Sequence, residues 1–115
     1  MKLSIITINY NNASGLERTI KSIIPILDSY IEYIVIDGAS TDNSADVIKK
    51  NSQYIDYWIS ESDKGVFHAM NKGAAKAQGE YLLYINSGDI INENTDFKRI
   101  IKDLNNEDII YYDIV

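Results

Sequence analysis

The chain is built from short apolar runs, rich in branched residues, that alternate with segments of helical periodicity. The first run is LSIITIN at 3–9, and comparable runs occur at 33–37, 56–60, 80–86 and 107–115. Continuous apolar runs of this kind are typical of strands that are buried on both faces. Their alternation with helical segments predicts an α/β fold, with a mostly parallel sheet and helices on both of its faces.

Helical periodicity follows the first apolar run. Apolar side chains recur there at spacings of three and four residues from Leu16 to Leu27. Ser14 and Glu17 fit the spacing of a capping box at the start of this helix. The single proline, Pro25, is expected to kink or shorten the helix near its end.

Further helices are expected at 44–50, 66–77 and 95–104. Gly79 is expected to stop the second of these three helices. His68, the single histidine, is expected to be partly exposed without a role. The inward face of the helix at 66–77 is expected to consist of Phe67, Met70, Ala74 and Ala77.

The composition is that of a globular protein, and we expect residues 1–115 to form a single domain. The formal net charge is −6, and the chain has no cluster of basic residues, which argues against binding to nucleic acid. The absence of cysteine excludes disulfides and thiolate metal sites. No apolar run has the length of a membrane span and the start lacks the features of a signal peptide, which predicts a cytoplasmic protein.

Each of the first four apolar runs is followed by a polar segment. Turns and helix caps use the same residue types, so one such segment by itself indicates no site. The carboxyl ends of parallel strands meet at one edge of the sheet, however, and open α/β sheets bind ligands there. Four polar loops at one edge therefore favour a binding site. Their residues are Asn9, Tyr10, Asn11 and Asn12, then Asp37, Gly38, Ser40, Thr41 and Asp42, then Glu61, Asp63, Lys64 and Gly65, and finally Asn86, Ser87, Gly88 and Asp89.

Two common nucleotide-binding motifs are missing from the sequence. It contains neither GxGxxG nor GxxxxGKS/T, so it signals neither dinucleotide binding nor P-loop phosphate binding. A ligand at the predicted edge is therefore expected to be held by carboxylates and amides. If the ligand is an anion, this acidic protein needs a local cation, a helix N-terminus or a metal ion to bind it.

Three segments of the chain resemble the successive signatures of family 2 glycosyltransferases, which have the GT-A fold. They are SIITINYNN, YIVIDGASTDNS and SESDKGVFHAMNKGAAKAQGEYLLYINSGD. The resemblance covers essentially the whole chain, in order and with similar spacing. It implies a Rossmann-like nucleotide-diphosphate-sugar-binding domain, a divalent cation (Mg²⁺ or Mn²⁺), and inverting transfer of a sugar to a glycan or lipid-linked acceptor. It also implies a part in bacterial surface polysaccharide assembly, in the cytoplasm or at the inner face of the membrane.

The resemblance implies donor-binding roles for residues after the first two strands. Thr7, Asn9 and Tyr10 match the place where the first loop of the family packs around the nucleoside. Asp37 matches the acidic residue that hydrogen-bonds the nucleobase. A carboxylate accepts hydrogen bonds and so suits an imide N–H such as that of uracil, which favours a UDP-sugar. Asp42 matches an acidic position of the STD turn, where a cap for the following helix is an equally good interpretation.

The third and fourth loops carry the remaining positions. Lys64 and Gly65 match a region that lies along the donor, although a solvated surface lysine is an equal interpretation of Lys64. Ser87 and Gly88 precede Asp89, which matches the last acidic position of the metal-binding motif of the family. Many relatives have an acid where this chain has Gly88. The resemblance therefore implies a cation held by Asp89, the diphosphate and water.

The general base of an inverting transferase deprotonates the acceptor hydroxyl and is usually an acid. In the family it belongs to the second half of the domain, so we expect it beyond residue 115. The chain is thus expected to be a truncated, N-terminal donor-binding part that binds nucleotide, transfers sugar poorly or not at all, and self-associates through exposed core surface. The alternatives are a non-catalytic α/β nucleotide-binding or interaction module and a receiver-like domain. The second is disfavoured because receivers need paired acids where this chain has asparagines.

Overall fold

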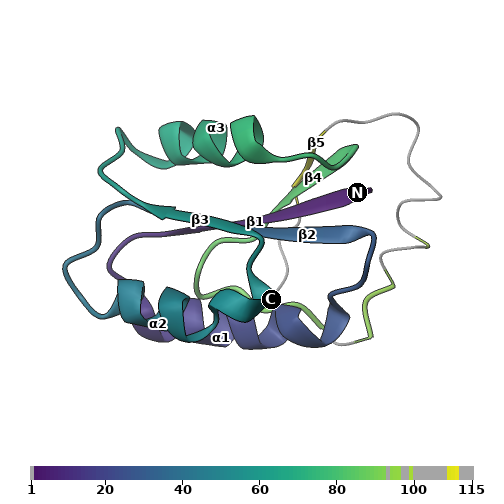
Figure 1. The fold of residues 1–115 in the computed structure, drawn as a ribbon, viewed down its shortest axis with the longest axis horizontal. Coiled ribbons are helices and arrows are strands. Elements are labelled where there is room, and N and C mark those ends of the chain that lie inside the picture. Colours follow the sequence, from purple (N-terminus) through teal and green to yellow (C-terminus); the bar gives the residue numbers. More distant parts are fainter. Residues whose placement is uncertain (1, 93, 97–98, 100–108, 112–115) are drawn as a thin grey trace.

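The computed structural model of the chain describes residues 2–92, 94–96, 99 and 109–111. Strands and helices alternate along the chain, and none of the helices in the described part is long and apolar enough to cross a bilayer (Figure 1). In chain order the elements are β1 (Leu3–Asn9), α1 (Ala13–Ile23), the 3-10 turn η1 (Ile24–Ile26), β2 (Ile31–Asp37), α2 (Ser44–Lys50), the 3-10 turn η2 (Ser52–Tyr54), β3 (Tyr57–Ser60), α3 (Val66–Lys76), β4 (Tyr81–Tyr84) and β5 (Ile109–Tyr111).

The strands form one sheet in the order β3-β2-β1-β4-β5, and each neighbouring pair is parallel. β1 is the central strand, so Leu3 lies opposite both Ile31 of β2 and Tyr81 of β4. Helices α1 and α2 cover one face of the sheet, and α3 covers the other (Figure 1). The predicted α/β fold, with a parallel sheet and helices on both faces, is therefore confirmed.

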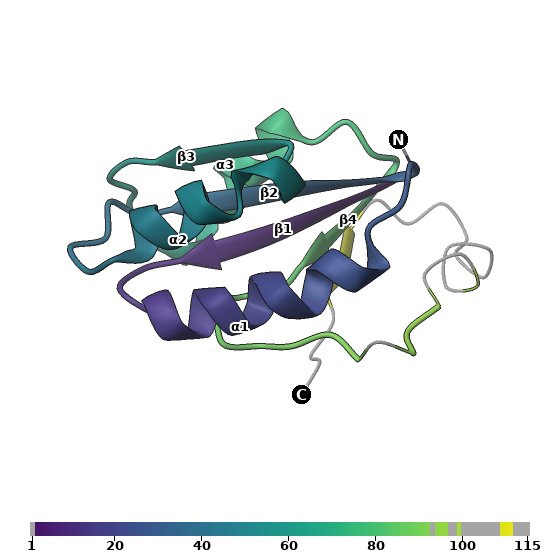
Figure 2. The same cartoon turned by 60° about the horizontal axis from the view of Figure 1, so that its bottom comes forward.

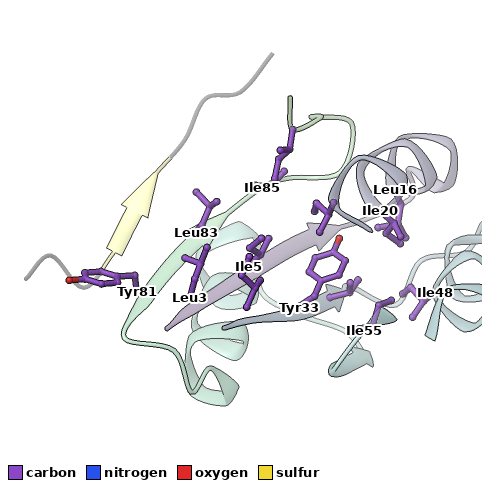
Figure 3. Close-up of a cluster of buried hydrophobic side chains, with 14 residues drawn as sticks. Leu3, Ile5, Leu16, Ile20, Tyr33, Ile48, Ile55, Tyr81, Leu83 and Ile85 are labelled. Carbon is purple, nitrogen blue, oxygen red and sulfur yellow. The ribbon is translucent and has the colours of Figure 1, made fainter. Parts of the chain in front are cut away.

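Alternation along the central strand divides the core into two clusters. Ile5 joins a larger cluster on the side of α1 and α2, whereas Ile6 joins a smaller one on the side of α3. Leu16 and Ile20 of α1 reach the larger cluster, where the ring of Tyr33 also lies (Figure 3). These side chains have no solvent-accessible surface, so α1 is closely packed on the sheet from which the loops extend.

α1 begins two residues earlier than the predicted capping box requires. Its N-cap is Asn12, whose Oδ1 accepts a hydrogen bond from the Gly15 N–H at 3.2 Å. The prediction of a capping box formed by Ser14 and Glu17 is therefore wrong. Ser14 lies inside the helix, and Glu17 pairs with Lys50 of α2 at 2.9 Å instead.

The other element boundaries agree closely with the sequence. α1 stops at Ile23, and a 3-10 turn that contains Pro25 follows, because proline supplies no N–H to a continuing helix. The helix predicted at 44–50 is confirmed as α2. β2 begins two residues earlier than predicted, at Ile31, and β4 ends two residues earlier, at Tyr84.

The inward face of α3 differs from the prediction. Ala69 and Gly73 are its buried residues, whereas Phe67 is 80% exposed, so the placement of Phe67 in the core is wrong. A Cβ on Gly73 would lie 2.6 Å from the Ile6 Cγ2. The helix therefore packs on the sheet through its smallest residues, and Phe67, which lies about 200° around the helix from Ala69, turns to solvent.

Gly79 has a different function from the predicted helix stop. α3 already ends at Lys76, and Ala77 is extended. A Cβ on Gly79 would lie 2.7 Å from the Ser4 backbone nitrogen, so this glycine is needed for close packing against β1. The helix predicted at 95–104 falls largely outside the described residues, and the last predicted strand is described only as β5.

We predict that Gly79→Ala lowers the free energy of unfolding by about 1–3 kcal/mol, because backbone atoms cannot move aside for the new methyl group. Urea unfolding followed by circular dichroism measures the change. Gln78→Ala is the control, since the side chain at 78 is exposed and its loss is expected to cost less than about 0.5 kcal/mol. Equal stability of the two variants would contradict the packing argument.

Candidate functional site

The loops that follow the parallel strands leave the sheet at one edge, as Figure 2 shows for β1, β2 and β3. A cavity of about 370 Å³ opens at this edge, on the side of α3. Its size is within the range of small-ligand sites. It is lined by Ile8, Asn9, Tyr10, Gly38, Ser62, Asp63, Gly65, Val66 and Ala69.

Three of the predicted donor-binding residues, Asn9, Tyr10 and Gly65, line this cavity. The Tyr10 side chain is 64% exposed, which leaves its ring free to stack on a ligand. A Cβ on Gly38 would lie 2.9 Å from the Asp63 Oδ2 and 3.3 Å from the Tyr10 Cδ1. Gly38 therefore keeps open a space that any larger residue would fill.

Asp37 lies at the end of β2 and has no exposed surface. Its Oδ1 accepts hydrogen bonds from the Asn9 Nδ2 at 2.8 Å and the Ser40 Oγ at 2.7 Å. Its Oδ2 accepts from the Ser40 N–H at 3.0 Å and the Ser60 Oγ at 2.7 Å. A carboxylate offers about four acceptor positions, so these donors occupy all of them.

The environment of Asp37 keeps it charged. Burial raises the pKa of the Asp37 carboxyl, but hydrogen bonds from Ser40, Asn9 and Ser60 outweigh burial and hold that pKa below its ordinary value. The carboxylate therefore joins the ends of β1, β2 and β3 at neutral pH.

Asn9 combines a bound amide nitrogen with a free oxygen. Because a carboxylate only accepts hydrogen bonds, the Nδ2 must be the atom that faces Asp37, which sets the orientation of the amide. The Asn9 Oδ1 is then buried without a hydrogen-bond partner in the described part of the chain. A buried acceptor of this kind suits a hydrogen bond from an ordered water.

Asp42 connects the second loop to the starts of two helices. Its Oδ2 accepts from the Ala13 N–H of α1 at 3.0 Å, and its Oδ1 accepts from the Ser44 N–H of α2 at 3.0 Å. Hydrogen bonds from Ser44 and Ala13 hold the pKa of the Asp42 carboxyl below its ordinary value. Asp42 does not line the cavity, so its contacts favour the helix-cap interpretation over direct donor binding.

The loop between β3 and α3 forms another wall of the cavity. The Lys64 N–H donates to the His68 Nδ1 at 2.7 Å, and the Gly65 N–H donates to the Asp63 Oδ1 at 3.1 Å. Gly65 has φ of 111°, a conformation that favours glycine. The N-cap of α3 is Gly65, which has no side chain to cap the helix, and α3 meets the cavity at Gly65 and Val66. Lys64 is exposed, as either interpretation of this residue requires.

Thr7 lies away from the cavity, in contrast to the prediction. It is fully buried on the side of α1, and its hydroxyl lies 2.8 Å from that of Tyr33. Burial raises the pKa of the Tyr33 hydroxyl, which therefore stays neutral. The next residue, Ile8, faces the opposite side of the sheet and lines the cavity instead. Strand alternation after Thr7 is the signal that indicates Ile8.

Sequence reasoning also missed Ser62, Val66 and Ala69 as lining residues. Val66 and Ala69 are three residues apart in a predicted helix, which places them on one face and was a usable signal. Nothing in the sequence distinguishes Ser62 from other loop serines.

Ser87, Gly88 and Asp89 follow β4 at the same edge of the sheet but do not line the cavity. The Ser87 N–H donates to the Ile8 carbonyl at 3.1 Å, and the Asn12 Nδ2 donates to the Ser87 carbonyl at 3.4 Å. Gly88 has φ of 102°, which favours glycine at this position. The loop is therefore tied to β1 and to the start of α1.

Asp89 is the residue predicted to bind the cation. The described residues contain no group of three or more His, Cys, Asp or Glu side chains arranged to hold a metal ion. Mg²⁺, however, commonly uses one or two carboxylates together with substrate phosphates and water. The donor set around Asp89 therefore fits a hard divalent cation only when a diphosphate supplies further oxygen ligands.

The family described as Glycosyl transferase family 2 matches residues 4–115 of the chain. The chain belongs to this family. A glycosyltransferase of Mycobacterium tuberculosis is 41% identical to this family 2 chain over 88 residues, which are 76% of the chain and 34% of the relative. A putative teichuronic acid biosynthesis glycosyltransferase of Bacillus subtilis, TuaG, is 31% identical over 90 residues, 76% of the chain and 36% of the relative. The chain thus spans about a third of the length of these relatives.

Solved structures of two other proteins have the same fold. S. aureus TarS 1-349 in complex with UDP-GlcNAc superposes with a TM-score of 0.77 at 24% identity, over 89% of this family 2 chain and 30% of that chain. A mannosyltransferase from Pyrobaculum calidifontis in complex with GDP-Man and Mn²⁺ gives a TM-score of 0.68 at 22% identity, over 77% and 28% of the two chains. These likenesses confirm the predicted GT-A fold.

We predict that Asp37→Asn lowers the free energy of unfolding by about 1–3 kcal/mol at pH 7, because the amide places donors against the donors of Ser40, Asn9 and Ser60. The folded-state pKa of Asp37 is depressed, so its carboxylate stabilises the fold fully above the ordinary value of about 3.9. That contribution is lost as the pH falls below this value. The difference between wild type and variant should therefore shrink in acid.

Urea unfolding from pH 7 down to pH 3 measures this difference. Asp46→Asn on α2 is the control, because Asp46 is exposed and its loss should change stability by less than about 0.5 kcal/mol. A difference for Asp37→Asn that stays constant through the acid range would count against the hydrogen-bonded carboxylate.

Proposed function

We propose that this chain binds a nucleotide-diphosphate-sugar, preferably a UDP-sugar, as the donor-binding part of an inverting glycosyltransferase. The observation that carries the proposal is the cavity at the carboxyl edge of the sheet, whose lining includes the exposed Tyr10 together with Asn9, Gly38 and Gly65. Because the chain belongs to family 2, we infer that the ligand of this cavity is the nucleotide-sugar donor.

The nucleoside would occupy the cavity beside Tyr10. The exposed aromatic ring offers a stacking surface to a base, and the glycine at 38 leaves room for it. Asp37 remains our candidate acceptor for an imide N–H, although its present donors occupy it. The Ser60 hydroxyl, on an exposed residue, can rotate away and release one acceptor position.

The diphosphate would lie between the cavity and the loop after β4. The uncapped start of α3 and the neighbouring Lys64 favour negative charge there, as an acidic protein requires for binding an anion. Asp89 would hold Mg²⁺ or Mn²⁺ together with the diphosphate oxygens. The bound cation would neutralise charge on the departing nucleotide.

The acceptor and the general base belong, in this proposal, to the part of the longer relatives that the chain does not span. Asp37 and Asp42 have other tasks, since both accept hydrogen bonds within the protein, and Asp89 is the proposed ligand of the cation. We therefore expect the isolated chain to bind nucleotide and to transfer sugar poorly or not at all. Robust turnover of a nucleotide sugar by the isolated chain would overturn this part of the proposal.

The biological setting proposed here is the assembly of a bacterial surface polysaccharide from a glycan or lipid-linked acceptor. The likeness to TuaG, whose name places it in teichuronic acid biosynthesis, supports this setting. Such work would locate the complete enzyme in the cytoplasm, at the inner face of the membrane. The second candidate function is a non-catalytic nucleotide-binding or interaction module, which the engagement of the Asp37 and Asp42 carboxylates in hydrogen bonds within the protein favours.

We predict that the chain binds UDP more tightly than GDP or dTDP and that Mn²⁺ strengthens the binding of UDP by about tenfold or more, or 1.4 kcal/mol. Asp89→Asn should remove most of that gain, because the cation then loses its carboxylate ligand. Calorimetric titration with each nucleotide, with and without Mn²⁺, measures these effects.

Asp46→Asn is the control for this titration, because it removes an equal charge from the exposed surface of α2. If none of the three nucleotides binds, the donor-site proposal fails. If UDP binds equally well without the metal ion, the role given to Asp89 fails and the nucleoside site stands.

A further inference from the structure

One side of α1 carries polar side chains that hydrogen-bond the loop after β4. Asn12, Thr19 and Ser22 lie at helical spacing beside the apolar residues, such as Leu16 and Ile20, that face the core. Thr19 has no exposed surface. A hydroxyl in such a position needs hydrogen-bond partners, and the backbone of the loop supplies them.

Thr19 and Ser22 bind the backbone of the loop at Gly88, Asp89 and Ile91. The Thr19 Oγ donates to the Asp89 carbonyl at 2.6 Å and accepts from the Gly88 N–H at 2.9 Å. One helical turn later, the Ser22 Oγ accepts from the Ile91 N–H at 3.0 Å and donates to the Thr19 carbonyl at 2.8 Å. The backbone on both sides of the Asp89 side chain is therefore attached to α1.

This attachment matters because a lone carboxylate must be aimed by its backbone. The described residues contain no group of three or more His, Cys, Asp or Glu side chains that could hold a cation at Asp89, so the direction of this one carboxylate matters. The neighbouring Gly88 adopts φ of 102° and, as a glycine, has unusual freedom to leave that conformation. The hydroxyl of Thr19 forms hydrogen bonds with the backbone of both Gly88 and Asp89. These bonds oppose rotation of the backbone between the two residues, which would displace the Asp89 carboxylate.

We propose that Thr19 is a positioning residue, whose hydroxyl holds the Gly88–Asp89 backbone so that the Asp89 carboxylate meets the cation and diphosphate of the bound nucleotide. Ser22 supports it through the Thr19 carbonyl and Ile91. The inference rests on the proposed function and extends it to α1. The three family signatures quoted above do not include this helix, because the first of them ends at Asn12.

The test compares Thr19→Val, which removes the hydroxyl and keeps the shape, with Thr19→Ser, which keeps the hydroxyl. Titration with UDP, with and without Mn²⁺, gives the factor by which the metal strengthens binding for each variant. In Thr19→Val, the factor by which Mn²⁺ strengthens UDP binding should fall about tenfold or more, in the range found for residues that orient metal ligands. Thr19→Ser should keep it, and UDP binding without metal should be the same in both.

Ser4→Ala is the matched control for stability. The Ser4 hydroxyl is also fully buried, accepts from a glycine N–H (Gly79, 2.9 Å) and donates to an acceptor (Glu32, 2.6 Å), but it lies at the opposite end of β1. Its removal should destabilise the fold without changing the effect of Mn²⁺. A loss of the Mn²⁺ effect in this control, equal to that in Thr19→Val, would show a general structural effect and overturn the inference.

The remaining outcomes separate this inference from the proposed function. A wild-type chain that binds no UDP, or binds it regardless of Mn²⁺, would overturn the donor or metal proposal and this inference with it. A Mn²⁺ effect that is present in wild type and unchanged in Thr19→Val would overturn the inference alone. If Thr19→Val does not fold, Ser22→Ala carries the test, because Ser22 is only half-buried and an undiminished Mn²⁺ effect there would also overturn it.

Discussion

The central strand β1 pairs in parallel with β2 on one side and with β4 on the other, and this register decides what meets at the ligand edge. Asn9 lies opposite Asp37, which in turn lies opposite Ser60 of β3. The hydrogen bonds from Asn9 and Ser60 to the Asp37 carboxylate follow directly from that alignment. A shift of one residue would send Asp37 to the other face of the sheet and separate all three.

The loops at this edge are held mainly by side chains that bind backbone groups. Asp42 holds the starts of α1 and α2, and Thr19 holds the loop after β4. Lys72 of α3 donates to the Ser62 carbonyl at 2.9 Å in the loop after β3. Contacts of this kind shape a loop without filling its cavity with side chains. They explain how polar loops can be well ordered and still leave space for a ligand.

Many of the polar residues at this edge consequently have structural tasks. The segment IVIDGASTDNS illustrates the division. Asp37, Ser40 and Asp42 accept or donate hydrogen bonds within the protein, whereas Gly38 borders the cavity. This segment has more polar residues than a turn needs, because its side chains bind a neighbouring strand and the starts of two helices.

The sequence by itself determined the alternating α/β fold, the extents of β1 and α2, the common edge for four polar loops and the family resemblance. These features depend on local periodicity and on turn residues, which each segment expresses without its neighbours. The sequence did not determine the N-cap of α1, since Ser14 and Asn12 both suit that position and only the Gly15 contact decides. It also placed Phe67 in the core, where the small residues of α3 pack instead.

Only the tertiary structure decided which polar residues face the cavity and which face the protein. Thr7 and Ile8 are neighbours in one strand, yet one bonds Tyr33 in the core and the other lines the cavity. Thr19 lies 70 residues from Asp89 in the chain, and nothing in either local segment indicates their contact. Such pairings depend on the parallel register and on how α1 packs across the sheet, which are properties of the assembled fold and of no single segment.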